Sequence, residues 1–198
     1  MVTSEKFEAM KAIRDEVVAL RGGLADFRRQ NVYHAVLGEG SHDSKIMFIG
    51  EAPGQNEANT GRPFCGAAGK LLDQLLESIG VPRQSVYITN IVKDRPPGNR
   101  DPLPSEIELY APFLDRQIEI IQPKCIATLG RFSMEYIMRK FDLSFELEPI
   151  SKAHGKLYKA EALWGPVKIA PQYHPAAAIY NQSLVETLNK DFQVLKTL

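Results

Sequence analysis

Cysteine is scarce in this sequence. Among the 198 residues only Cys65 and Cys125 carry a thiol, and no CxxC motif occurs. A disulfide framework and a four-cysteine metal site both need more thiols than these two supply. We therefore expect both cysteines to pack as small hydrophobic side chains, and we predict that the protein holds no metal.

Long hydrophobic runs are also absent. No stretch approaches the roughly 18 consecutive apolar residues that a membrane-spanning helix needs. A secretory signal peptide is not expected either, because the N-terminal helical pattern is interrupted by the charged residues Glu5, Lys6, Lys11, Arg14 and Asp15. These features predict a cytoplasmic protein without a membrane segment.

Neither sign of charge is in excess. Lys plus Arg and Asp plus Glu number 24 each, so the formal net charge is +0. This balance argues against a protein that holds nucleic acid through a broad basic face. It remains compatible with binding through a few local cations and a deep pocket.

Hydrophobic periodicity predicts strands that alternate with helices. The helical pattern covers residues 7–20, 71–79, 107–121, 131–140 and 184–195. Short apolar strands are expected at 45–50, 86–92, 125–130, 156–158 and 167–171. This order is typical of an α/β sandwich with a mostly parallel sheet. Pro112 implies either a kink in its helix or a late helix start.

We predict a single domain over residues 1–198, in which residues 1–37 form an N-terminal helix and an irregular segment packed on the rest. Three polar loops rich in Gly and Pro follow predicted strands, at 50–64, 90–100 and 174–181. Ligands of open α/β sheets bind outside the carboxyl ends of the strands. These loops are therefore the candidate functional segments.

The first loop, 50–64, contains two carboxylates and an aromatic ring. Glu51 and Glu57 are able to orient a water molecule or act as a base, and Phe64 is able to stack on a planar ring. The alternative is that the carboxylates cap or solvate the turn and that Phe64 belongs to the core. No GxGxxG motif occurs, so a dinucleotide loop is not expected.

The second loop begins with Asn90 at a strand end, where its amide offers a donor and an acceptor on one plane. Such an amide suits the imide edge of a pyrimidine, which presents an acceptor beside an N–H donor, and in the same orientation it mismatches cytosine. Asn99 follows in a Pro-rich turn. The cations expected to contact phosphates are Lys93, Arg95 and Arg100. The alternative is that Asn90 satisfies the strand end and the cations are solvated.

The third loop carries His174, followed by Pro175, which fixes the turn. This histidine is able to donate a hydrogen bond to a developing oxyanion, although a structural role is the alternative. Ile179 and Tyr180 end the loop and are able to wedge into a base stack. We expect His34 and His154 to be structural.

Together and in this order, the segments resemble the family 4, thermophile-type uracil-DNA glycosylases. The matching stretches are GEAPG…TGRPF at 50–64, FCGAAGKLL at 64–72, YITNIVK…RPPGNRDP at 87–102 and HPAAAIYN at 174–181. The resemblance extends from about Leu37 to the C-terminus. It implies a three-layer α/β/α sandwich around a mostly parallel four-stranded sheet, and excision of uracil from single- and double-stranded DNA.

The resemblance also assigns roles position by position. Phe64 would stack on the uracil, Asn90 would read its Watson–Crick edge, and the Ala52 backbone would touch the base. His174 would stabilise the departing uracil anion at O2. The polar residues that would support water placement and catalysis are Glu51, Glu57 and Asn99.

The sequence departs from the family at the positions that bind an iron–sulfur cluster. Most members have four cysteines that hold a 4Fe–4S cluster. Ligation of such a cluster needs cysteine thiolates at suitable spacing. Here Asp94 replaces the cysteine of VKCRPP, Tyr110 replaces the fourth ligand, and Cys65 and Cys125 match no ligand position. We predict that the cluster is absent, that no cofactor is used, and that packing holds residues 21–37 instead.

The predicted activity is monofunctional, because no lysine stands in an obvious Schiff-base position. The expected partner is uracil-containing DNA, and we expect a monomer. Two alternatives stay open. One is a non-catalytic binder of deaminated DNA, and the other is a glycosylase that prefers another deaminated base such as hypoxanthine or xanthine.

Overall fold

The computed structural model describes residues 3–197, and residues 1, 2 and 198 of the predicted domain lie outside this range. A six-stranded sheet has the order β1-β3-β2-β4-β6-β5. Its strands are β1 (Glu39–Gly40), β2 (Ile46–Gly50), β3 (Tyr87–Asn90), β4 (Cys125–Leu129), β5 (Tyr158–Ala162) and β6 (Gly165–Gln172). The organisation of residues 1–198 as one domain stays a prediction.

The prediction of a four-stranded sheet is wrong in its strand count. Strands β3, β2, β4 and β6 are parallel to their neighbours, but β1 and β5 add antiparallel edges. Strand β1 has only two residues, too few for a period-two pattern. Strand β5 begins at Tyr158 rather than ending there, and the charged Lys159 and Glu161 hide it from a hydrophobicity reading.

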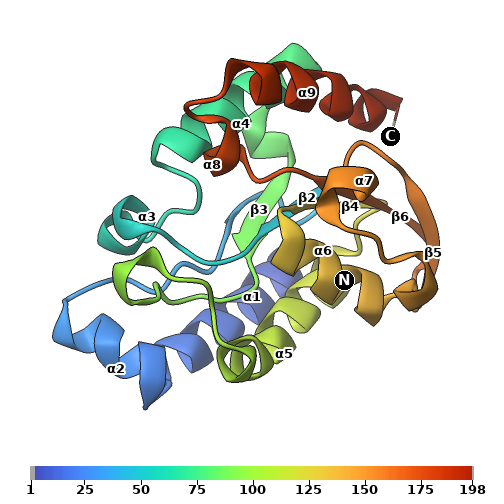
Figure 1. Cartoon of the computed structure of the whole chain (residues 1–198). Helices are drawn as coiled ribbons and strands as arrows, with labels where there is room; N and C mark the ends of the chain where they lie inside the picture. The colour runs from blue at the N-terminus through green and yellow to red at the C-terminus, as the bar shows by residue number, and fades with distance from the viewer. Residues whose placement is uncertain (1–2, 198) are drawn as a thin grey trace.

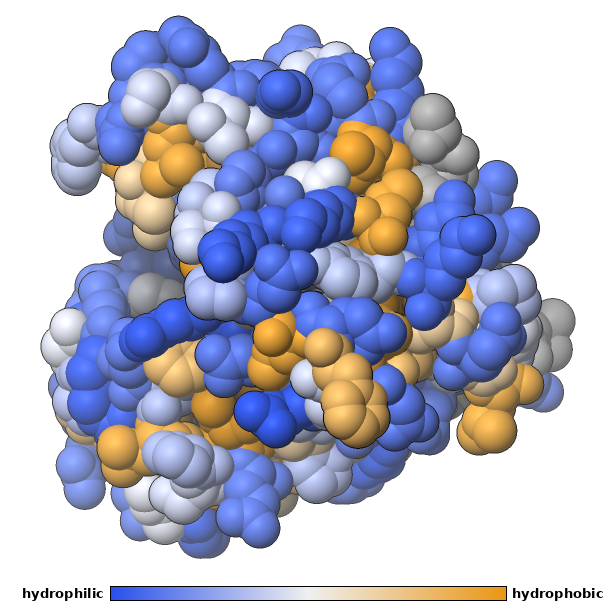
Figure 2. All heavy atoms as spheres, turned by 45° about the vertical axis from the view of Figure 1, so that its right-hand side comes forward, coloured by the Kyte–Doolittle hydropathy of each residue, from blue (hydrophilic) through white to orange (hydrophobic). Residues whose placement is uncertain are grey.

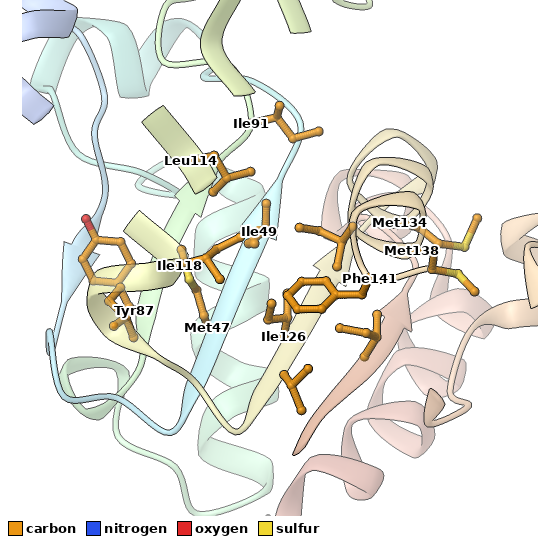
Figure 3. Packing of buried hydrophobic residues seen from close by; sticks show 14 of the residues in the cluster. Met47, Ile49, Tyr87, Ile91, Leu114, Ile118, Ile126, Met134, Met138 and Phe141 are labelled. Carbon is orange, nitrogen blue, oxygen red and sulfur yellow. The ribbon is translucent and has the colours of Figure 1, made fainter. Parts of the chain in front are cut away.

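Helices cover both faces of the sheet (Figure 1). One face packs against α1 (Thr3–Ala19), α5 (Pro104–Ile121) and α6 (Arg131–Lys140). Figure 3 shows part of this layer, in which Met47 and Ile49 of the sheet lie beside Leu114 and Ile118 of α5, and Ile126 lies beside Phe141. Because side chains of a strand alternate between faces, the neighbouring residues Phe48 and Ala127 join the opposite layer.

The opposite layer consists of α4 (Ala67–Ser78) and α9 (Gln182–Phe192). Phe48 of β2 stacks on Phe192 of α9, with ring centroids 5.8 Å apart. The remaining short helices are α3 (Gln55–Thr60), α7 (Ile150–Ala153) and α8 (Pro175–Ala178), with 3-10 turns at Arg83–Ser85, Pro97–Asn99, Ser144–Glu146 and Gln193–Thr197. The sheet therefore lies between two helical layers.

Two local expectations are corrected. The segment after α1, predicted to be irregular, contains α2 (Gly23–Gln30). Its sequence is too short and too polar to give a clear helical period, and the left-handed φ of 83° at Gly22 separates it from α1. Pro112 lies inside α5, which begins at Pro104, so a late helix start is excluded.

The surface drawn in Figure 2 is mainly hydrophilic, with hydrophobic residues in small separate groups. Within residues 3–197, no helix is both long enough and apolar enough to cross a membrane.

The parallel strands bring the predicted loops to one edge of the sheet. Strand β2 ends at Gly50, and its register places this residue opposite Asn90 at the end of β3. Strand β6 ends at Gln172, two residues before His174. The three loops therefore converge, as expected for the carboxyl edge of such a sheet.

Candidate active site

A cavity of about 310 Å³ opens where these strands end. Its walls combine carboxylates, an aromatic ring, amides and a histidine from all three loops. The lining residues are Glu51, Ala52, Pro53, Gly54, Glu57, Phe64, Ala68, Asn90, Pro96, Asn99, Arg100, His174 and Ala176. The structure thus brings together every predicted catalytic and base-contacting residue. Of the predicted DNA contacts, only Arg100 is in this wall.

Asn90 forms a buried polar end to the cavity. Its side chain is 1% exposed, and its Oδ1 has no hydrogen-bond partner among the described residues. A Cβ at Gly50 would lie 2.3 Å from Asn90 Oδ1 and 2.7 Å from Phe64 Cζ. Glycine at position 50 is therefore required for the amide and the ring to approach each other. A buried acceptor without a partner is costly unless a ligand supplies a donor.

Phe64 is held in a strained backbone conformation. Its φ is 47°, in the left-handed region that residues other than glycine rarely adopt. A Cβ on Gly69 of α4 would meet the Phe64 carbonyl oxygen at 1.8 Å, so the close contact depends on that glycine. The ring lies 5.6 Å from the His174 ring, tilted by 31°. Phe64 thus forms an apolar wall that faces the histidine.

The hydrogen bonding of His174 defines its tautomer. Its Nδ1 accepts a hydrogen bond of 3.1 Å from the backbone N–H of Ala176 at the start of α8. Burial lowers the pKa of His174 to about 4, with the Glu57 carboxylate opposing the shift. The ring is therefore neutral near pH 7, and because Nδ1 is an acceptor, Nε2 carries the proton. His174 is a hydrogen-bond donor without net charge.

Glu57 has a structural task at the cavity edge. Its Oε1 accepts hydrogen bonds of 2.9 Å each from the backbone N–H groups of Cys65 and Gly66. These bonds fix the turn that presents Phe64 and satisfy donors at the start of α4. Oε1 of Glu57 therefore caps the turn, which was the alternative to a catalytic role for this carboxylate.

Glu51 is the less constrained carboxylate. No side-chain hydrogen bond of Glu51 occurs among residues 3–197, and burial raises its pKa to about 7. The Asp101 carboxylate adds to this rise and the Arg131 guanidinium opposes it. A carboxyl group that titrates near neutral pH is suited to accept a proton from water.

Asp101 and Arg131 were not singled out from the sequence. Arg131 Nη2 lies 2.5 Å from Asp101 Oδ2, so this pair joins the loop after β3 to the start of α6. A usable signal existed, because β4 is a fourth parallel strand whose end at Leu129 reaches the same edge. Arg131, the first residue of α6, follows that strand end, so the pattern of strand ends pointed to it.

One predicted phosphate contact is wrong. The Lys93 side chain is completely buried, and its Nζ bonds inside the protein. It folds back under β3 instead of entering solvent, so it is out of reach of a phosphate.

The other predicted cations are reachable but engaged. Arg95 Nε donates to Asn99 Oδ1 at 2.7 Å, and its Nη1 donates to the Tyr33 hydroxyl at 3.1 Å. Arg100 forms a two-point ion pair with Glu106, with distances of 2.9 and 2.6 Å. Arg95 has no carboxylate partner in the described chain, which makes it the freer of the two cations.

Ile179 and Tyr180 lie just beyond the cavity wall formed by Ala176. Tyr180 is 100% exposed and Ile179 is 36% exposed. Two apolar side chains in solvent next to a cavity are suited to contact a ligand larger than the cavity itself. Their role as a wedge stays a prediction.

The residues at the cluster positions do not fit an iron–sulfur cluster. Asp94 accepts a hydrogen bond of 2.9 Å from Arg28 Nη1 and one of 2.6 Å from the Tyr110 hydroxyl. All three side chains are buried. Cys125 lies at the start of β4, at the opposite end of the strand from the cavity, and Cys65 follows Phe64. No group of three or more potential ligands occurs among residues 3–197.

The comparisons with known proteins agree with this geometry. The family model described as the uracil DNA glycosylase superfamily matches residues 37–196. Because the match spans most of the chain, this protein belongs to the uracil DNA glycosylase superfamily.

Within that superfamily the chain is similar to proteins named type-4 uracil-DNA glycosylase. It is 47% identical over 193 residues to the one from Sulfurisphaera tokodaii, which covers 96% of this chain and 85% of the relative. It is 47% identical over 163 residues to the one from Archaeoglobus fulgidus, covering 82% and 81%. Identity to a type-5 uracil-DNA glycosylase from Pyrobaculum aerophilum is 27%, covering 75% and 70%. The predicted resemblance to family 4 is confirmed, whereas the absence of the cluster stays a prediction.

Proposed function

We propose that this protein is a monofunctional uracil-DNA glycosylase of base excision repair. It would flip uracil out of single- or double-stranded DNA and hydrolyse the N-glycosidic bond to leave an abasic site. The similarity to type-4 uracil-DNA glycosylases supports this function. The observation that carries it is the buried, unpartnered Oδ1 of Asn90 in a cavity walled by Phe64 and His174.

Uracil matches the Asn90 amide. Its N3–H donates to Oδ1 while its O4 accepts from the Nδ2 group, and its ring stacks on Phe64. Cytosine offers an unprotonated N3 and an amino group at this edge, so both contacts fail for an amide in this orientation. An unpaired buried polar group costs about 1–3 kcal/mol, which is the physical basis of the discrimination.

Departure of the base requires stabilisation of its charge. As the bond between C1′ and N1 breaks, its electron pair passes to uracil and negative charge develops at N1 and O2. The Nε2–H of His174 would donate to O2, one of the atoms that share this charge. A neutral donor held in place by its Nδ1 bond needs no reorganisation during the reaction.

The sugar cation then needs a water molecule. We assign its orientation to Glu51, because one oxygen of Glu57 already accepts two backbone hydrogen bonds. The water oxygen adds to C1′, and one of its protons passes to the Glu51 carboxylate. Asn99 would complete the polar wall around this water.

The DNA backbone would meet the cations beside the cavity. Arg95 and Arg100 would contact phosphates, and Ile179 and Tyr180 would fill the space that the flipped nucleotide leaves. Flipping gives up stacking and pairing worth a few kcal/mol, and less in single strands. No lysine is among the cavity residues listed above for the described chain, which supports hydrolysis without a Schiff base. A cytoplasmic monomer remains our expectation.

A panel of single-stranded oligonucleotides tests the function. Each carries uracil, hypoxanthine or xanthine at one position, and excision is read as alkali-labile cleavage in the presence of EDTA. We expect cleavage at uracil and little at the purines, because a two-ring base needs more room than uracil between Asn90, Phe64 and His174, although its edge offers Asn90 the same donor and acceptor. Fluorescence anisotropy with the same strands measures binding separately. Tight binding of the uracil strand without cleavage would show a non-catalytic binder, and cleavage only at a purine would show a different substrate.

A further inference from the structure

Lys93 is buried directly behind the base-reading residue. Its Nζ lies 2.6 Å from the Asn90 carbonyl oxygen, 2.8 Å from Thr89 Oγ1 and 2.6 Å from Gln117 Oε1. The side chain is completely buried. The chain turns after β3, and this turn places the Lys93 amine against the last residue of β3, Asn90.

The three neighbours of Nζ act only as acceptors. The Thr89 hydroxyl gives its proton to the Leu37 carbonyl oxygen at 2.6 Å. The Gln117 Nε2 group donates to the same carbonyl at 2.9 Å, which turns Oε1 toward the lysine. A backbone carbonyl has no proton to give. Three acceptors require three N–H donors, and only the ammonium form of lysine has three.

This ammonium has no direct counterion in the described chain. No carboxylate between residues 3 and 197 lies within ion-pair distance of Lys93 Nζ. The adjacent carboxylate, Asp94, is taken by Arg28 and Tyr110. Burial lowers the pKa of Lys93 well below its ordinary value, whereas hydrogen bonds to three acceptors favour the charged form. The site therefore holds a buried cation compensated by dipoles rather than by an anion.

We infer that Lys93 is a positioning residue for base excision that holds the Asn90 backbone and places a buried positive charge behind the departing uracil anion. This inference rests on the proposed glycosylase function. A fixed charge in a region that excludes water acts more strongly than one in solvent, and it favours the anion over the neutral base. Lys93 would therefore raise the rate of bond breakage more than it tightens DNA binding.

Two variants separate the charge from the fold. Lys93→Met removes the ammonium and keeps the length of the side chain. Gln117→Glu keeps an acceptor for Lys93 and pairs its charge with a carboxylate, and it also removes the bond from Gln117 Nε2 to the Leu37 carbonyl oxygen. Thr89→Val is the matched control, because it removes one hydrogen bond of Lys93 and leaves the charge in place. Circular dichroism and thermal melting establish which variants are folded.

The readout is single-turnover excision of uracil and of 5-fluorouracil from the same single-stranded oligonucleotide. Fluorine withdraws electrons, so the fluorinated anion leaves more easily and needs less stabilisation. We expect Lys93→Met and Gln117→Glu to slow uracil excision by about 10- to 100-fold. The same two variants should slow the excision of 5-fluorouracil by a several-fold smaller factor, and their Kd for DNA should be nearly that of wild type. Thr89→Val should slow the excision of uracil and of 5-fluorouracil by the same factor.

Equal losses on the two bases in a folded variant would overturn the role of the charge, and so would a wild-type rate in Gln117→Glu. If Lys93→Met does not fold, Gln117→Glu still decides the matter. Wild-type protein that excises neither base would instead overturn the proposed function. The two failures are therefore distinguishable.

Discussion

Arg28 is expected to be the main anchor of the N-terminal segment. Its guanidinium donates to Asp94 and also to the Val17 and Val18 carbonyl oxygens at 3.3 and 2.9 Å. It thus joins the end of α1, α2 and the loop after β3, and Tyr110 adds α5. The perturbation is Arg28→Met, which keeps the bulk of the side chain and removes the charge.

The expected loss is large because the pair is buried. The side chains of Arg28 and Asp94 are 5% and 0% exposed, so the variant leaves an unpaired buried carboxylate. Breaking such a pair costs about 3–5 kcal/mol. For a domain of this size each kcal/mol lowers Tm by about 2–4 °C, which gives a drop of roughly 6–20 °C. Tyr110→Phe removes one hydrogen bond to the carboxylate and should cost about 1.5–3 kcal/mol.

Thermal and urea unfolding measure these losses. Arg116→Met is the matched control, because Arg116 pairs with Glu16 at the surface, where both side chains are more than 40% exposed. Exposed pairs contribute little, so its Tm should stay near the wild-type value. The double variant Arg28→Met/Asp94→Leu should lose less than the sum of the single variants. A small loss in Arg28→Met, or strict additivity in the double variant, would refute the anchoring role.

Five further outcomes are expected. Because the folded pKa of Glu51, about 7, exceeds its ordinary value of 4.5, kcat/KM should rise with pH through about 7, and a flat profile would contradict its role as base. The same shift disfavours the carboxylate in the folded state, so the stability of wild type relative to Glu51→Gln should be greatest below pH 4.5 and decline as pH rises through 7, measured by urea unfolding. Gly50→Ala should slow excision by about 100-fold in a single-turnover assay, since its Cβ would lie 2.3 Å from Asn90 Oδ1. Arg95→Ala should raise KM and reduce the slope of log Kd against log salt by about 1, and an unchanged slope would exclude a phosphate contact. Iron analysis should find no stoichiometric iron, and EDTA should leave the rate unchanged.

The cavity could be predicted from the sequence because its residues lie at strand ends. Gly50, Asn90 and His174 each follow a short apolar run, and parallel strands bring such ends to one edge. The family resemblance then supplied roles that the spacing alone left open.

Other features depend on tertiary contacts that no local pattern records. From the sequence Lys93 is expected to be a solvated cation, because it lies in a polar loop. In the structure the turn after β3 buries it. Arg28 and Asp94 meet across 66 positions of sequence. The edge strand β1 was not predicted because two residues are too few for a hydrophobic pattern, and the bounds of β5 were misplaced because its charged residues obscure that pattern.

The central claim is that Asn90 reads the uracil edge and His174 stabilises the anion. Its most direct test is single-turnover excision of uracil from a single-stranded oligonucleotide, with EDTA present. Wild type is compared with Asn90→Ala, His174→Ala and the control Asn189→Ala, whose side chain bonds within α9. We predict rapid alkali-labile cleavage by wild type and the control, and losses of about 100- to 1,000-fold in the other two variants. Cleavage at the wild-type rate by folded Asn90→Ala or His174→Ala would contradict the account.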